Sequence, residues 1–160
     1  MYVMVKVLDP DKGVSCVFRQ PRAMSHCRLA HGYDLRFTIA LGAHDLDENG
    51  WVYDFGKLAP LRERIKETFD HKWIVGMDDP HGNEITKLAE LGIVSLSILE
   101  RTGCEFFAAW CAAEAADVLS STGDLGRVRV LSATCSENGA NHATFRVPYN
   151  DMESGNAWQY

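Results

Sequence analysis

The chain has 160 residues, of which 46% are hydrophobic and 24% charged, and its formal net charge is -6. This length supports one hydrophobic core, and the acidic charge argues against sequence-independent binding of nucleic acid, which depends on a basic surface. No run of about 20 apolar residues is available to cross a membrane, and the start lacks the regions of a signal peptide, so we expect a cytoplasmic protein that binds no membrane.

The first third of the chain predicts strands. Residues 1–8 and 14–18 are apolar and separated by the turn residues 9–13, a pattern typical of a hairpin. Residues 33–40 alternate between apolar and polar side chains, which indicates a strand with one covered face. After a polar turn, residues 51–53 predict a brief further strand.

Two helices are expected next. Apolar residues recur at spacings of three and four over residues 58–69, which predicts a helix that packs on the sheet. A second, more apolar helix begins after residues 102–105, where Thr102 and Glu105 match a capping box. Residues 93–99 predict a short strand between the two helices.

The last strands complete an α+β fold. Residues 127–135 and 142–147, joined by a polar turn, predict a closing hairpin. The order of elements indicates a four-stranded antiparallel sheet with two helices on one face, formed by a single domain over residues 1–148. Residues 149–160 lack periodicity and form a C-terminal tail. Because four strands leave exposed sheet edges, we expect a homo-oligomer.

Several short segments, in this order and spacing, resemble signatures of the 6-pyruvoyl-tetrahydropterin synthase and 6-carboxy-tetrahydropterin synthase family. Members of that family usually read F-S-A-A-H-R, then C-x-x-L-H-G-H, then G-x-V-x-D-F, then D-H. The corresponding segments here are VSCVFR at 14–19, CRLAHGY at 27–33, NGWVYDF at 49–55 and FDHK at 69–72, followed by TGCE at 102–105, which is similar to the family's P-T-x-E.

The resemblance implies a T-fold, in which four-stranded sheets of several subunits form a shared barrel with the helices outside. It further implies trimers, usually stacked into a hexamer, with active sites between subunits. The implied activity is that of a carbon–oxygen lyase, which converts 7,8-dihydroneopterin triphosphate to a 6-substituted tetrahydropterin with loss of triphosphate. The 6-carboxy branch of the family serves queuosine and other 7-deazaguanine pathways.

Three candidate catalytic residues follow from the resemblance. Cys27 matches the family's catalytic cysteine, and Asp70 with His71 matches the pair that tunes its acid–base relay. Such chemistry needs a base close to the carbon that loses a proton, and a nearby histidine helps to hold a cysteine as thiolate. Taken singly, Cys27 is typical of a buried small residue, and His71 of a surface histidine at a helix end.

The family's zinc site is incomplete in this sequence. The family uses three histidines, but Phe18 and Tyr33 stand at two of the three places, and only His31 is retained. Catalytic zinc needs three protein ligands and one open position. We therefore expect that the metal has been lost; the alternative is a rebuilt site that combines His31 with Cys16 or His26.

The expected substrate-binding residues also depart from the family pattern. The family anchors the pterin ring with a glutamate in an E-T dipeptide, and Ala133 with Thr134 stands at that place. The anchor is therefore missing or has moved, and Thr134 alone matches. Arg19, Arg28 and Lys72 flank the motifs and are the expected cations for a triphosphate.

Other acidic residues have simpler explanations in the sequence. Glu105 is accounted for by helix capping and Glu137 by a solvated turn. The segment 78–81, Asp-Asp-Pro-His, could gather a metal, but a polar loop interrupted by proline explains it equally well.

Two classes of function remain open from the sequence. The first is a divergent tetrahydropterin synthase, or an enzyme that acts on a related pterin, and that uses Cys27, His31, Asp70 and His71. The second is a T-fold assembly without this activity, which binds a pterin, a purine or another protein.

Overall fold

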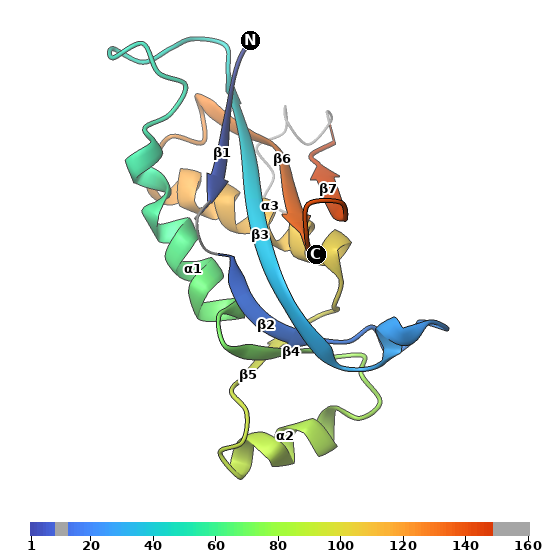
Figure 1. Ribbon diagram of the computed structural model, residues 1–160. Helices are drawn as coiled ribbons and strands as arrows, with labels where there is room; N and C mark the ends of the chain where they lie inside the picture. Colours follow the sequence, from blue (N-terminus) through green and yellow to red (C-terminus); the bar gives the residue numbers. More distant parts are fainter. Residues whose placement is uncertain (9–12, 149–160) are drawn as a thin grey trace.

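A mixed sheet of seven strands runs through the computed structural model, which describes residues 1–8 and 13–148 (Figure 1). Its strands are β1 (Tyr2–Leu8), β2 (Val14–Phe18), β3 (His31–Ala43), β4 (Lys72–Gly76), β5 (Leu96–Leu99), β6 (Val128–Ser136) and β7 (His142–Arg146). The helices are α1 (Ala59–Phe69), α2 (Gly82–Glu90) and α3 (Cys104–Ser121), with short 3-10 turns η1 (His26–Arg28) and η2 (Phe55–Leu58).

Strand β3 organises the sheet because it is long enough to pair with three neighbours. Strand β1 pairs with its C-terminal half and β2 with its N-terminal half, both antiparallel and along the same edge. The predicted hairpin between residues 1–8 and 14–18 is therefore wrong, because these two strands lie end to end on β3 instead of pairing with each other. On the other edge β6 pairs with β3, and the predicted closing hairpin of β6 with β7 is confirmed.

The sheet has seven strands rather than the expected four, and β5 is the short strand predicted within residues 93–99. Strands β4 and β5 run parallel to β2 in the order β2-β4-β5, whereas β1, β2, β3, β6 and β7 are joined by antiparallel pairs. Strand β4 was not predicted from the sequence. The brief strand predicted at residues 51–53 is wrong, because this segment is a bend.

The helices explain how the sheet is covered. Helices α1 and α3 lie together on one face of the sheet (Figure 1), and the predicted α+β fold is confirmed. Helix α2, which the sequence analysis missed, lies at the end of the molecule near β4 and β5. Among residues 1–8 and 13–148, no helix combines the length and hydrophobicity that a membrane crossing requires.

The predicted capping box of α3 is wrong. The N-cap is Gly103 in a left-handed conformation (φ 125°), and no side chain caps the helix. Instead, the Thr102 hydroxyl donates a hydrogen bond of 2.5 Å to the Arg19 carbonyl. Thr102 therefore ties the start of α3 to the residue that follows β2.

A continuous aromatic core lies between the sheet and the two helices. The ring of Phe69 on α1 makes edge contacts with Phe107 and Trp110 on α3, at centroid distances of 5.0 and 5.1 Å. Phe37 of β3 lies 5.1 Å from the same ring, and Phe18 of β2 lies 5.1 Å from Phe107. The apolar spacing of α1 and α3 thus reflects burial against one another and against β2 and β3.

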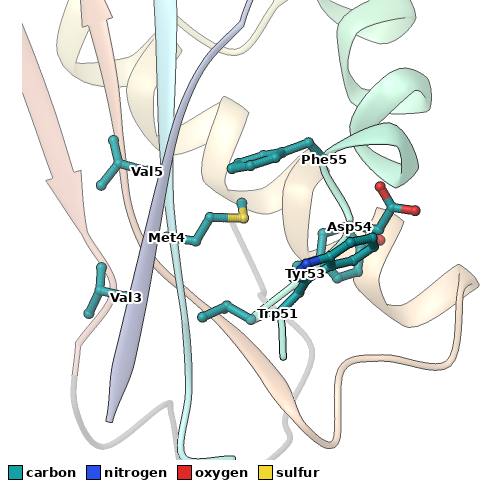
Figure 2. A pocket seen from close by; sticks show the side chains of 8 residues that line it. Val3, Met4, Val5, Trp51, Tyr53, Asp54 and Phe55 are labelled. Carbon is teal, nitrogen blue, oxygen red and sulfur yellow. The ribbon is translucent and has the colours of Figure 1, made fainter. Parts of the chain in front are cut away.

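An apolar groove lies beside β1, on the edge that does not pair with β3. Its volume is about 500 Å³, and it is lined by Met4 of β1, by Trp51 and by Phe55, the first residue of η2 (Figure 2). Val3 and Val5 of β1 also line it and are exposed. The groove contains none of the candidate catalytic residues. The predicted turn at residues 9–12 and the tail at 149–160 lie outside the described residues.

Candidate functional site

Two stacked aromatic rings fill the place where the resemblance puts zinc-binding histidines. The register of β2 and β3 sets Phe18 opposite His31, and Cys16 opposite Tyr33. The Phe18 and Tyr33 rings stack at a centroid distance of 3.9 Å and an interplanar angle of 16°. Phe18 is only 1% exposed, and its ring also makes a T-shaped contact with Phe107 at a centroid distance of 5.1 Å. The two rings therefore continue the aromatic core outward to His31, whose ring lies 4.6 Å from Tyr33.

The residues at this place do not fit a zinc ion. His31 Nδ1 donates to the Leu29 carbonyl at 2.8 Å, which leaves Nε2 as its only free ring nitrogen. The His26 ring lies 6.0 Å from the His31 ring, and Cys16 is buried, which raises the pKa of its thiol to about 12. Over residues 1–8 and 13–148, no group of three His, Cys, Asp or Glu side chains is placed to hold a metal. Because zinc needs at least three ligands, the rebuilt site with Cys16 or His26 has no support in this geometry.

Cys27 lies in η1, within the loop that connects β2 to β3. Its side chain is half-buried, whereas the other four cysteines are buried. Its carbonyl accepts a hydrogen bond of 2.8 Å from the Gln20 amide, and Ser25 caps the turn by accepting from the Cys27 amide at 3.3 Å. Cys27 is thus the cysteine whose thiol a small reagent or substrate can reach most readily.

Asp70 and His71 form a contact pair at the C-terminal end of α1. His71 Nδ1 lies 3.1 Å from a carboxylate oxygen of Asp70, and the same oxygen accepts from the Ser15 amide at 3.3 Å. The His71 amide donates to the Ser15 carbonyl at 2.7 Å, and His71 has a positive φ of 56°. The His71 side chain is 85% exposed, so the pair is fixed on β2 by the backbone while its imidazole faces solvent.

The structure does not bring this pair to Cys27 within one chain. Asp70 and His71 are attached at Ser15, and Cys27 lies beyond Phe18, at the other end of β2. Three residues of extended strand separate Ser15 from Phe18, which is about 10 Å. No contact between Cys27 and the Asp70–His71 pair is found among the described residues of one chain, and the meeting of the two in a shared cleft stays a prediction.

The three cationic residues predicted to bind triphosphate differ in whether their side chains already bind another residue of the chain. The Arg19 guanidinium binds both carboxylate oxygens of Asp79, at 2.8 and 2.5 Å. Lys72 Nζ donates to Ser95 Oγ at 2.8 Å, and the Arg28 side chain belongs to an exposed residue. Arg28 is thus more open to an anion than Arg19, and the role of all three in binding triphosphate stays a prediction.

The place of the pterin anchor holds no carboxylate. Ala133 is buried, and the Thr134 hydroxyl lies 2.8 Å from that of Thr144 on β7.

Burial raises the pKa of Tyr33 to about 12, and the negative charge of Glu137 adds to this effect. Glu137, assigned from sequence to a solvated turn, is therefore close enough to Tyr33 to influence it electrostatically.

Asp79 lies in the segment 78–81, which the sequence predicts to be a polar loop, and its contact with this region was not predicted. Its carboxylate is 3% exposed and also accepts from the His81 amide at 2.9 Å, in the turn that precedes α2. The Arg19 hydrogen bonds hold the pKa of Asp79 below its usual range. The available signal was the Asp-Pro step, since Asp side chains often bond to the backbone two residues on. No spacing rule, however, indicates a partner 60 residues away.

Comparison with known proteins identifies relatives for most of the chain. The family model described as 6-pyruvoyl tetrahydropterin synthase matches residues 12–148. The 6-carboxy-5,6,7,8-tetrahydropterin synthase of Rickettsia conorii is 39% identical over 54 residues, which are 33% of this chain and 39% of the relative. The enzyme of that name from Aquifex aeolicus is 26% identical over 78 residues, 49% of this chain and 48% of the relative. The matched stretches thus span less than half the length of these curated relatives.

Solved structures resemble the chain over nearly its whole length. An uncharacterized protein from Wolinella succinogenes superposes with a TM-score of 0.75 at 18% identity, covering 91% of this chain and 97% of its own. A 6-pyruvoyl tetrahydropterin synthase from Plasmodium vivax gives a TM-score of 0.65 at 13% identity, covering 91% and 98%. At these identities the likeness shows that the fold is shared.

Proposed function

Because the chain belongs to the 6-pyruvoyl tetrahydropterin synthase family, we propose that it is a divergent lyase acting on 7,8-dihydroneopterin triphosphate or a related pterin. The observation that carries this proposal is the retained pair of Asp70 and His71, held at 3.1 Å and fixed to β2, together with a half-buried Cys27. The two curated relatives named above are 6-carboxy-5,6,7,8-tetrahydropterin synthases, which favours a 6-carboxy product. We propose that this product serves a queuosine or other 7-deazaguanine pathway.

The proposed roles follow from what each group can do. Cys27 removes a proton from the carbon beside a substrate hydroxyl or carbonyl, and His71, oriented by Asp70, exchanges protons with the substrate. His31 keeps its family place, and in its protonated form Nε2 would donate a hydrogen bond to a substrate oxygen. We propose that no zinc binds at this place, because Phe18 and Tyr33 supply rings where ligands would be needed.

We expect the active form to be an oligomer built from trimers. Strands β1 and β7 each pair on one edge only among the described residues, and exposed Val3, Val5 and Phe55 line the groove beside β1. Association covers these edges and brings His71 of one copy toward Cys27 of another. Light scattering at micromolar concentration should give the mass of three or six chains. A monomer would contradict both the assembly and the relay.

The aromatic rings that occupy the expected zinc-ligand positions support a second candidate function. An assembly that lost its zinc ligands while keeping its fold could bind a pterin, a purine or another protein without turning it over. The stacked rings of Phe18 and Tyr33 favour this candidate, because they remove the usual means of polarising a substrate oxygen. Tight binding of a pterin without product would support it over the lyase.

The lyase proposal is tested by His71→Gln, with His44→Gln as the matched control. Both histidines are exposed, but His44 follows β3 and is not part of the Asp70 pair. Loss of proton transfer should lower kcat by roughly 100-fold or more in His71→Gln. Turnover in His44→Gln should equal that of the unmodified chain. Equal turnover in both variants would remove the proposed relay.

A further inference from the structure

We propose that Asp79 is a positioning residue for Cys27, because it clamps Arg19 in the orientation that closes the loop between β2 and β3. The inference deepens the proposed function and rests on it for the role of Cys27. It assigns a task to the turn before α2, a part of the chain that contains no candidate catalytic residue.

The clamp begins at Arg19, the first residue after β2. Its guanidinium uses Nε and one terminal nitrogen to bind Asp79, and the other terminal nitrogen donates to the Arg28 carbonyl at 3.3 Å. Arg28 directly follows Cys27. One planar group therefore connects the turn before α2 to the backbone beside the thiol, and this fork geometry is available to arginine but not to lysine.

Neighbouring hydrogen bonds make the loop a closed unit. The Gln20 amide donates to the Cys27 carbonyl at 2.8 Å, so the two ends of the loop are joined directly beside Arg19. The Arg19 carbonyl accepts from the Thr102 hydroxyl at 2.5 Å, which attaches the same residue to the start of α3. Arg19 thus has fixed partners on three separate segments.

Asp79 is well suited to hold Arg19 because it is itself fixed. Its side chain is 3% exposed, and its carboxylate accepts from the His81 amide at 2.9 Å. The backbone of Asp79 bonds to Gly76 at the end of β4 and to Gly82 at the start of α2. Arg19 therefore links the position of Cys27 to the end of the buried strand β4.

Asp78 provides the contrast that makes the proposal specific. It lies one residue earlier and contacts Arg22 at 3.3 Å, but the Arg22 side chain is 75% exposed. Ion pairs between exposed groups contribute little to structure. Asp78→Asn removes one carboxylate charge from the same turn without touching Arg19, and so serves as the matched control for Asp79→Asn.

The experiment measures the accessibility of Cys27 and of its loop without any substrate. The full chain is treated with iodoacetamide, and modification at each cysteine is followed by peptide mass spectrometry. Hydrogen exchange of the Gln20 amide is measured in parallel. Because the opening equilibrium of a loop follows the free energy that closes it, Asp79→Asn should raise the Cys27 alkylation rate roughly tenfold and lower Gln20 protection similarly. Asp78→Asn should match the unmodified chain in both.

The variant Arg19→Lys distinguishes a loss of Cys27 positioning from a loss of overall stability. Lysine keeps the charge facing Asp79 but cannot reach the Arg28 carbonyl at the same time, so Cys27 should react faster while the paired amides of β3 and β6 stay protected. This variant decides the question if Asp79→Asn fails to fold. Unchanged Cys27 reactivity, or a parallel loss of protection throughout β3 and β6, would overturn the proposal. An inactive but correctly responding protein would contradict the lyase proposal alone.

Discussion

Replacing Phe18 by alanine is expected to lower the free energy of unfolding by about 3–5 kcal/mol, the usual cost of removing a large buried aromatic side chain. Phe18 is 1% exposed, stacks on Tyr33 at 3.9 Å and meets the edge of Phe107 at 5.1 Å. Its removal therefore opens a cavity between β2, β3 and α3. Denaturant unfolding at a fixed protomer concentration measures the effect as a lower midpoint with an unchanged slope.

Phe55→Ala is the matched control for this loss. The Phe55 side chain is 52% exposed and lies in the groove beside β1, where Lys6 approaches its ring at 5.2 Å. Its replacement should cost about 1 kcal/mol or less. If Phe18→Ala costs no more than Phe55→Ala, the ring at this place is not a packing element, and the account of a filled metal site fails.

The second large effect is the creation of a zinc site by Phe18→His combined with Tyr33→His. The register places residues 18 and 31 opposite one another, and residue 33 projects on the same face of β3 as His31. Three imidazoles would then converge where two rings now stack, with an open fourth position. The double variant should retain about one zinc per chain after dialysis, and saturating zinc should raise its unfolding midpoint.

The single variants and the unmodified chain are the controls. Each single variant has two imidazoles, so it should lose zinc on dialysis, and zinc should not shift the midpoint of the unmodified chain. A double variant that folds but binds no zinc would show that the scaffold around residues 18, 31 and 33 has itself moved away from the family geometry. Stoichiometric zinc in the unmodified chain would contradict the filled-site account directly.

The sequence correctly predicted the strands and helices whose apolar periodicity follows from the burial of one face. The alternation over residues 33–40 predicted the central part of β3, because one face of that strand is buried against α1 and α3. The spacing of Leu61, Ile65 and Phe69 predicted α1 for the same reason. Helix α2 is short and buries only Ile85, and it was not predicted.

Features that depend on pairing between distant segments could not be predicted in the same way. The turn residues after β1 favour a hairpin, but the length of β3 lets both β1 and β2 pair with it instead. Within the candidate site, the resemblance located Cys27, Asp70 and His71, whereas the bond from Arg19 to Asp79 spans 60 positions and has no sequence pattern. The stacking of Phe18 on Tyr33 likewise follows from cross-strand register, which a list of motifs does not contain.

The measurement that tests the central claim most directly is the release of triphosphate from 7,8-dihydroneopterin triphosphate by the unmodified chain. The chain is first dialysed against a chelator, and its metal content is determined on the same sample. The account predicts triphosphate and a 6-substituted tetrahydropterin at less than 0.1 zinc per chain, a bound of roughly one tenth of the single ion that a complete site holds. Activity that disappears on dialysis and returns with one zinc per chain would contradict it, and no release at all would leave the binding function as the better description.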